Sequence, residues 1–292
     1  MRARADPHGA STSSPATPSA ATASAATPAP SSRAPRPWQG LASAVAFLTI
    51  VPVPAGAMAP ADARPAGLGA SAAWFPLVGA GVGALAGGVR LLFGSLLSAG
   101  VASVLAMIGL VIVTGALHQD GLADTADGLG VRDHARTADG RARRLEVMRD
   151  SSTGAFGALA LIAWALLLFT TVSSLDGAHA LRALVVACAL ARWAALAHAV
   201  ATPAARGDGL GASLQVGRGA LAIATVMAVA AAFAICGLGA GAAAILTAAL
   251  AAALSVAFAR RMLGGRTGDT LGATVAITEL AVCVVLLGVW QG

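Results

Sequence analysis

Repeated apolar runs of about 20 residues constrain this chain more than any other feature. About 20 helical residues are needed to cross the hydrocarbon core of a bilayer. A soluble domain carries roughly a quarter charged residues, whereas this chain has 11%. Seven runs qualify as spans, at about 72–97, 99–118, 154–174, 180–200, 219–237, 240–259 and 271–290. The sequence therefore predicts an all-α, polytopic integral membrane helix bundle with about seven transmembrane helices.

Two N-terminal segments fall outside these runs. Residues 1–36 consist mainly of Ala, Ser, Thr and Pro, a composition that predicts a disordered tail. Residues 38–54 are apolar but short, and two prolines end them. We expect this second segment to form a short re-entrant or interfacial helix rather than a span.

Arginine is distributed unevenly among the connections between the runs. The connections 54–71, 119–153, 201–218 and 260–270 contain arginines, whereas those near 98, 175–179 and 238 contain none. Seven spans place every arginine-rich connection on one side, which the positive-inside rule makes cytoplasmic. The net charge of +6 is therefore interpreted as a topology signal and not as a nucleic-acid-binding surface. The chain contains no lysine, which excludes Schiff-base, pyridoxal-phosphate and P-loop lysine chemistry.

Three aspartates gather in the stretch LHQDGLADTADGLG, Leu117–Gly130. On a helix, Asp120, Asp124 and Asp127 share one face, because their spacing is i, i+4, i+7. Their mutual repulsion is roughly 1–4 kcal/mol per pair, depending on the local dielectric. A hard divalent cation would relieve it, and Mg²⁺ takes oxygen ligands while bridging to phosphates. The alternative is a solvated loop with turn-forming Asp-Gly pairs.

Two further polar motifs follow along the chain. In RRLEVMRDSSTG, either Glu146 belongs to a charge-paired surface helix, or Arg149 contacts phosphate while Glu146 or Asp150 supports metal or sugar. In GGRTGDTLGA, Asp269 lies among glycines and threonines whose backbone N–H groups could bind an anion. The alternative for this second motif is a glycine-rich turn that caps a helix.

Isolated polar residues within the apolar runs form a separate group of candidates. Charged side chains such as Arg192 and Glu279 cost free energy inside a membrane, so either each has a function or the two neutralise one another. His118 is either a general base or a capping or packing residue. Gly79, Gly83 and Gly87 recur every four residues and predict close helix packing.

Taken in order, these motifs resemble one known family. His118–Gly128 reads HQDGLADTADG, Arg144–Ser151 reads RLEVMRDS, and Gly264–Ala273 reads GGRTGDTLGA. Softer matches are FLTIVPVP at Phe47–Pro54, FPLVGAGVG at Phe75–Gly83 and the Gly209–Gly211 turn. The chain is similar, from about residue 40 to its end, to the cobalamin synthases, the adenosylcobinamide-GDP ribazoletransferases.

This resemblance implies a Mg²⁺-dependent transferase of the bacterial cytoplasmic (inner) membrane, with its active site facing the cytoplasm. Its substrates would be adenosylcobinamide-GDP and α-ribazole, or α-ribazole 5′-phosphate, with GMP released. Residues 37–292 would form one transmembrane catalytic domain whose cytoplasmic acidic and arginine-rich loop is 119–153. The lipid bilayer is the expected partner, nucleic acid is not, and a homo-oligomer is compatible with the sequence.

The resemblance also suggests roles for individual residues. The expected metal ligands are Asp120, Asp124 and Asp127, and the expected catalytic residues are His118, Asp120, Arg149 and Asp150. The expected substrate-binding residues are Glu146, Ser151, Arg192, Gly265, Thr267, Gly268 and Asp269. The chain departs from the family pattern at Ser152, where relatives often have a basic residue, and at Ala276, where they often have Glu.

Two other functions fit part of the sequence. Another Mg²⁺-dependent membrane phospho- or prenyltransferase would explain the aspartates but not the other two motifs. A divalent-cation transporter would distribute its acidic residues through the spans, whereas here they concentrate in one connection.

Overall fold

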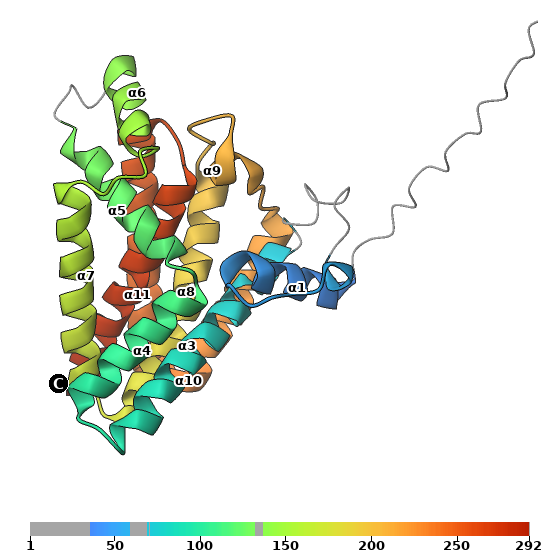
Figure 1. The fold of residues 1–292 in the computed structure, drawn as a ribbon. Coiled ribbons are helices and arrows are strands. Elements are labelled where there is room, and N and C mark those ends of the chain that lie inside the picture. The colour runs from blue at the N-terminus through green and yellow to red at the C-terminus, as the bar shows by residue number, and fades with distance from the viewer. Residues whose placement is uncertain (1–35, 59–68, 70, 132–136, 292) are drawn as a thin grey trace, which may run out of the picture. The chain divides into compact units, whose positions relative to one another are not determined.

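The computed structural model describes residues 36–58, 69, 71–131 and 137–291. The predicted tail lies outside the described residues except for Arg36, and Arg64 lies outside them as well. Met1–Arg33 form a separate unit, so the description concerns the unit Ala34–Gly292. The described part is helical and contains no strand, with one isolated bridge between Ala204 and Arg266. The predicted all-α class is therefore confirmed (Figure 1).

The helices follow one another without long interruptions. Their bounds are α1 (Pro37–Leu48), α3 (Phe75–Gly94), α4 (Ala99–Val113), α5 (Leu117–Gly130), α6 (Ala138–Val147), α7 (Ala155–Ser174), α8 (Gly177–Ala201), α9 (Gly209–Ser213), α10 (Arg218–Phe258) and α11 (Gly268–Gln291). Short 3₁₀ turns cover Ala55–Ala57 and Ala72–Trp74, and a π-helical turn covers Ala259–Leu263. At 12 residues α1 is too short to cross a bilayer, and it lies across the bundle rather than along it (Figure 1).

Among the described residues, five helical stretches are long and apolar enough to cross a membrane, and a bent pair would make six. The bent pair is α4 and α5, whose axes differ by 87°. The predicted run at about 99–118 therefore contains a break, because α4 ends at Val113 and α5 begins at Leu117. The chain leaves the helix because Gly115 and Ala116 adopt φ values of 60° and 58°. For Ala116 this left-handed conformation is unusual.

The longest helix, α10, is two arms joined at Gly237. A straight helix of its 41 residues would extend about 60 Å, twice the hydrocarbon thickness. Gly237 has φ 77° and ψ 179°, which is not helical. A Cβ atom on Gly241 would lie 2.9 Å from the Ala232 carbonyl oxygen, so the arms fold back against each other. The arms correspond to the predicted runs 219–237 and 240–259.

Helix α8 is the centre of the bundle. Its sequence is apolar on nearly every side, most of its side chains are buried, and it packs against α3, α10 and α11. The α3 glycines make the closest approach: Gly79, Gly83 and Gly87 lie against the backbone of α8 at Cys188, Leu184 and Leu181 respectively. The predicted role of these glycines in helix packing is confirmed.

Three of the four arginine-containing connections, 119–153, 201–218 and 260–270, meet at one end of the bundle. Arg149, in the α6–α7 connection, pairs with Asp208 after α8, and Arg206 pairs with Asp269 at the start of α11. The opposite end holds the α7–α8 turn, where Leu175 accepts a hydrogen bond from Arg90 and Ser174 accepts one from Gln291. Figure 1 shows α6 and α9 at the first end and the C-terminus at the second.

The packing at α3 predicts opposite effects for two neighbouring glycines. Gly83→Ala should destabilise the protein by about 1–3 kcal/mol, because its methyl group would enter the α8 backbone at Leu184. Gly81→Ala should stabilise it by about 0.5–1 kcal/mol, because Gly81 has open space around it and alanine favours helix. Thermal unfolding in detergent measures both. Equal effects at the two positions would contradict this packing.

Candidate active site

Close contact between α5 and α11 creates the core of the site. A Cβ atom on Gly121 would lie 2.6 Å from the Asp269 carbonyl oxygen, and one on Gly272 would lie 3.1 Å from that of Leu117. Only glycine permits backbones to approach so closely. This contact brings Asp269 beside the aspartates of α5.

Four carboxylates share this region. Asp124 is half-buried, and the negative charges of Asp120, Asp269 and Asp127 all act on it, opposed by the positive charge of Arg206. The helical face predicted for the three α5 aspartates is confirmed, since α5 is continuous from Leu117 to Gly130. Asp269 belongs to the separate motif Gly264–Ala273, so its position near Asp124 was not predicted from the sequence.

Within the described residues, no group of three or more His, Cys, Asp or Glu side chains is arranged to hold a metal ion. Mg²⁺ keeps several waters and takes one or two carboxylates together with substrate phosphates. Asp120, which is exposed, and the half-buried Asp124 and Asp269 supply such carboxylates.

Asp127 has a different role from the other aspartates. Its two oxygens accept hydrogen bonds from the backbone amides of Gly154, at 2.7 Å, and Gly157, at 2.8 Å. These amides belong to the N-terminus of α7, where the N-cap residue Gly154 has no side chain. Asp127 therefore caps α7 although it lies 27 residues before Gly154 in the sequence. Its negative charge also interacts favourably with the positive N-terminal end of the α7 dipole.

This cap can be tested separately from catalysis. Asp127→Ala should lower the free energy of unfolding by about 0.5–2 kcal/mol, whereas Asp127→Asn, which retains one acceptor oxygen, should lower it less. Hydrogen exchange at the amides of Gly154 and Gly157 should accelerate in the alanine variant. Unchanged exchange at both amides would rule out the cap.

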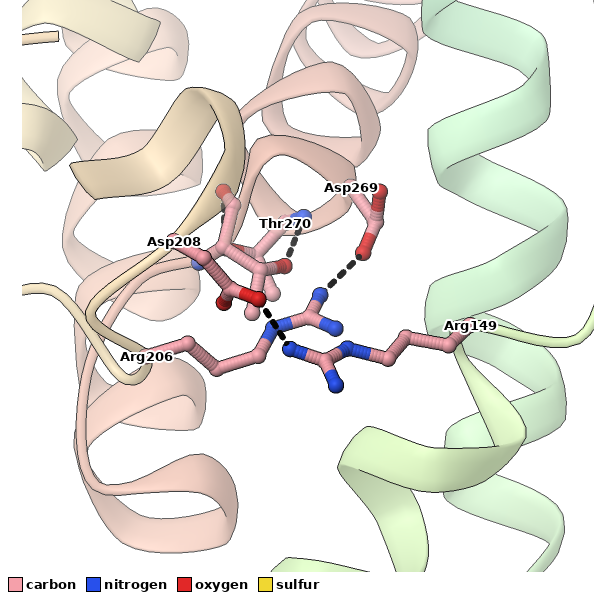
Figure 2. Close-up of polar contacts among 6 residues, drawn as sticks. Arg149, Arg206, Asp208, Asp269 and Thr270 are labelled. Carbon is pink, nitrogen blue, oxygen red and sulfur yellow. Dashed lines mark hydrogen bonds and ion pairs between the residues drawn. The ribbon is translucent and has the colours of Figure 1, made fainter. Parts of the chain in front are cut away.

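Two arginines lie side by side next to the acidic cluster (Figure 2). Arg149 donates to Asp208 at 2.5 Å, and Arg206 donates to Asp269 at 3.1 Å. Both arginines line a polar pocket of about 160 Å³, together with Arg266 and the first residues of α11. Arginine binds phosphate and carboxylate through the same planar donor geometry. Phosphate oxygens can therefore replace the carboxylates of Asp208 and Asp269.

The glycine-rich motif Gly264–Ala273 shapes this pocket through its backbone. The Thr267 amide donates to the Thr270 hydroxyl at 2.9 Å, and the Thr270 amide donates to the Thr267 hydroxyl at 3.1 Å. Both amides are therefore satisfied within the turn that starts α11, while Gly268 and Asp269 line the pocket. The predicted alternative of a helix-capping turn describes the two threonines correctly.

Gly265 and Arg266 hold the chain that carries Arg206. The Arg266 amide donates to Pro203, and its guanidinium donates to the carbonyl oxygens of Thr202 and Leu214. Gly265 packs against the backbone of residues 203–205 with no room for a Cβ atom. This positions Arg206 and Asp208, which sequence reasoning missed. The sequence feature that could have pointed to these two residues is the adjoining Gly209–Gly211 turn.

The remaining predicted site residues of the motif RRLEVMRDSSTG, Arg143–Gly154, lie at the surface. Glu146 pairs with Arg143 at 2.7 Å, with both side chains mostly exposed, as the surface-helix alternative predicted. Asp150 accepts hydrogen bonds from the amide and hydroxyl of Ser152, which hold the pKa of Asp150 below its ordinary value. Neither Glu146, Asp150 nor the exposed Ser151 lines the polar pocket. Their participation in catalysis or substrate binding stays a prediction.

His118 and Arg192 lie deeper in the bundle. Arg192 forms an ion pair with Glu279 and also donates to the Cys188 carbonyl oxygen, so the predicted mutual neutralisation is confirmed. His118 is buried and shares with Arg192 a small cavity of about 40 Å³, which adjoins the polar pocket at Leu210 and Gly268, but His118 itself does not line the polar pocket. This location favours a packing role for His118 over that of a general base.

The fold and this site together define the class of protein to which the chain belongs. The chain is a polytopic helical membrane protein with carboxylates and arginines gathered at one end, a combination suited to phosphate-bearing ligands. More narrowly, the chain belongs to the cobalamin-5-phosphate synthase (CobS) family, whose family model matches residues 40–287.

Curated relatives span nearly the whole of the same region. A protein of Azorhizobium caulinodans is 40% identical over 252 residues, covering 82% of this chain and 91% of the relative. One of Desulforamulus reducens is 38% identical over 256 residues, covering 86% and 97%. One of Leptothrix cholodnii is 40% identical over 267 residues, covering 85% and 94%. All three are named adenosylcobinamide-GDP ribazoletransferase. No solved structure matches the chain.

Proposed function

We propose that this protein is an adenosylcobinamide-GDP ribazoletransferase, an enzyme of the last steps of cobalamin synthesis. It transfers the cobinamide-phosphate group of adenosylcobinamide-GDP to α-ribazole or its 5′-phosphate, giving adenosylcobalamin or its 5′-phosphate, and GMP. The observation that carries this function is the placement of Arg149, Arg206 and Asp269 in one pocket, with Arg206 also acting on Asp124. Family membership supplies the identity of the substrates.

In the reaction, a ribose hydroxyl of ribazole other than the 5′-hydroxyl attacks the phosphorus that carries cobinamide, because the 5′-position already bears phosphate in the alternative acceptor. The bond from that phosphorus to the bridging oxygen breaks, GMP leaves with the bridging oxygen, and the hydroxyl proton passes to a carboxylate of the cluster. Negative charge grows on the phosphoryl oxygens during this step. Arg149 and Arg206 stabilise it after releasing Asp208 and Asp269.

The acidic cluster is also the proposed Mg²⁺ site. Asp120, Asp124 and Asp269 would hold the ion, whose charge offsets both their mutual repulsion and that of the diphosphate. Asp127 is committed to the α7 cap by both oxygens. We therefore assign the ligand role to Asp120 and Asp124 within α5.

We also propose that the site faces the cytoplasm from the bacterial inner membrane. The support is the meeting of three of the arginine-rich connections at this end of the bundle. A cation-transport function fits less well. Glu279, the acid deepest in the spans, is neutralised by Arg192, and the other acids of the site lie at one end.

The function is tested by reconstituting the full-length protein in lipid nanodiscs with adenosylcobinamide-GDP, α-ribazole and Mg²⁺. We expect a corrinoid product and stoichiometric GMP. Asp124→Asn should lower kcat by about 100-fold, because it removes charge that the site uses during phosphoryl transfer. It should also raise the Mg²⁺ concentration needed for half-maximal rate. Absence of product from folded wild-type protein would overturn the proposal.

A matched control separates this effect from general loss of negative charge. Asp139→Asn alters an exposed acid in the first turn of α6, outside the site. It should leave both kcat and the Mg²⁺ dependence unchanged. Equal losses in the two variants would remove Asp124 from the metal site.

The arginines allow a second test. Arg149→Ala should raise the KM for adenosylcobinamide-GDP by about tenfold or more, since a hydrogen bond to a charged group contributes about 1.5–3 kcal/mol. Arg143→Ala is the control, because Arg143 is exposed on α6 and contacts Glu146. Initial rates over a range of nucleotide concentration measure both. A KM for Arg149→Ala equal to that of Arg143→Ala would place the diphosphate elsewhere.

A further inference from the structure

An apolar groove of about 410 Å³ is lined mostly by residues outside the motifs above, together with a few from within them, including Thr125 and Thr270. It is formed by α5, α8, the second arm of α10 and α11. Leu250, Leu254 and Ile277 contribute to its wall and are themselves exposed, so the groove opens on the apolar flank of the bundle. Its size and apolar lining are typical of small-molecule sites.

The groove begins one residue from each of two site carboxylates. Thr125, which lines it, follows Asp124, and Thr270, which also lines it, follows Asp269. Successive helical residues point about 100° apart. On α11, the groove is lined by the residue next to Asp269, and Asp269 itself lines the polar pocket.

Two buried polar atoms in this wall have no hydrogen-bond partner among the described residues. They are the hydroxyl oxygen of Thr125 and Nε2 of His198, whose side chain is fully buried. His198 Nδ1 lies 2.9 Å from the Thr274 hydroxyl, which donates its own hydrogen to the Thr270 carbonyl oxygen. The Thr274 oxygen must then accept from Nδ1–H. In the neutral ring Nε2 therefore carries a lone pair and acts as an acceptor.

We propose that this groove binds the base of the acceptor nucleoside, a flat and largely apolar heteroaromatic ring. The inference rests on the proposed function and assigns one part of its second substrate. The base of ribazole is a dimethylated benzimidazole, which has one unsubstituted ring nitrogen and no N–H group. The Thr125 hydroxyl donates to this nitrogen, and His198 Nε2 accepts from a ribose hydroxyl. The ribose then lies near Asp124.

The other parts of the two substrates do not suit this groove. The diphosphate requires the arginines of the polar pocket, and the corrin ring exceeds the groove's volume of about 410 Å³. Guanine carries several donors and acceptors that an apolar wall cannot satisfy. A lipid acyl chain would fill the groove but leave Thr125 and His198 unpaired. The benzimidazole base is therefore the occupant that matches both the wall and its two polar atoms.

The test fills the groove without touching the polar pocket. Initial rates of the full-length protein in nanodiscs are measured over a range of α-ribazole concentration at saturating adenosylcobinamide-GDP. They are then measured over a range of adenosylcobinamide-GDP concentration at saturating α-ribazole. Ala251→Phe should raise the KM for α-ribazole by about tenfold or more. The KM for adenosylcobinamide-GDP should change by less than about twofold. Thr125→Val, which preserves shape and removes only the hydroxyl, should raise the KM for α-ribazole by about three- to tenfold.

Ala253→Phe is the matched control. Ala253 lies on the same arm of α10, is exposed and does not line the groove, so this variant should behave as wild type. If wild type is active and the KM for α-ribazole is unchanged in both Ala251→Phe and Thr125→Val, the groove holds a lipid chain. That result overturns this inference while leaving the proposed function in place.

Direct binding separates failure of the inference from failure of the function. Equilibrium dialysis of α-ribazole against loaded nanodiscs needs no second substrate and no turnover. Loss of binding in Ala251→Phe but not in Ala253→Phe supports the groove even if no product forms. Equal binding by both variants overturns it. A wild type that makes no product overturns the proposed function alone.

Discussion

Close approach between helix backbones is the constraint on which the rest of this structure depends. In a bilayer the surrounding lipid is as apolar as the helices, so burial of apolar side chains gives helices little reason to associate. Contact must come from tight packing, which small residues allow. Gly83 against α8 builds the centre of the bundle, and Gly121 and Gly272 between α5 and α11 build the site. The same property that holds the fold together brings Asp269 to Asp124.

That approach has an electrostatic consequence. Helix packing brings like charges together at Asp120, Asp124 and Asp269, and the positive charge of Arg206 opposes them at Asp124. Such an arrangement stores repulsion that a cation or an exchange of arginine partners can release. The Arg192–Glu279 pair is different, because each charge there already has its counter-ion and both side chains are almost fully buried. The first arrangement suits a reacting site, and the second suits a fixed support between α8 and α11.

Local patterns predicted the local features and failed where distant segments meet. Apolar runs located the long helices, arginine content sorted the connections, and the spacing of Asp120, Asp124 and Asp127 predicted their common face. No local pattern could show that Asp127 caps α7, because its partners Gly154 and Gly157 lie about 30 residues further on. The break at Gly115–Ala116 was also missed, since apolar character continues through it. Arg206 and His198 were overlooked because their roles depend on residues more than 60 positions away.

The placement of the carboxylates gives a physical reason for building this site in a membrane. Asp269 lines the polar pocket formed by arginines, and the next residue, Thr270, lines an apolar groove that opens on the flank of the bundle. A soluble protein would have to cover such a groove, because water in contact with its leucines is unfavourable. Here the bilayer covers that flank. On the proposed function, the phosphates approach from the end of the bundle and the apolar base occupies the side. The two substrates then meet at the carboxylates without competing for one entrance.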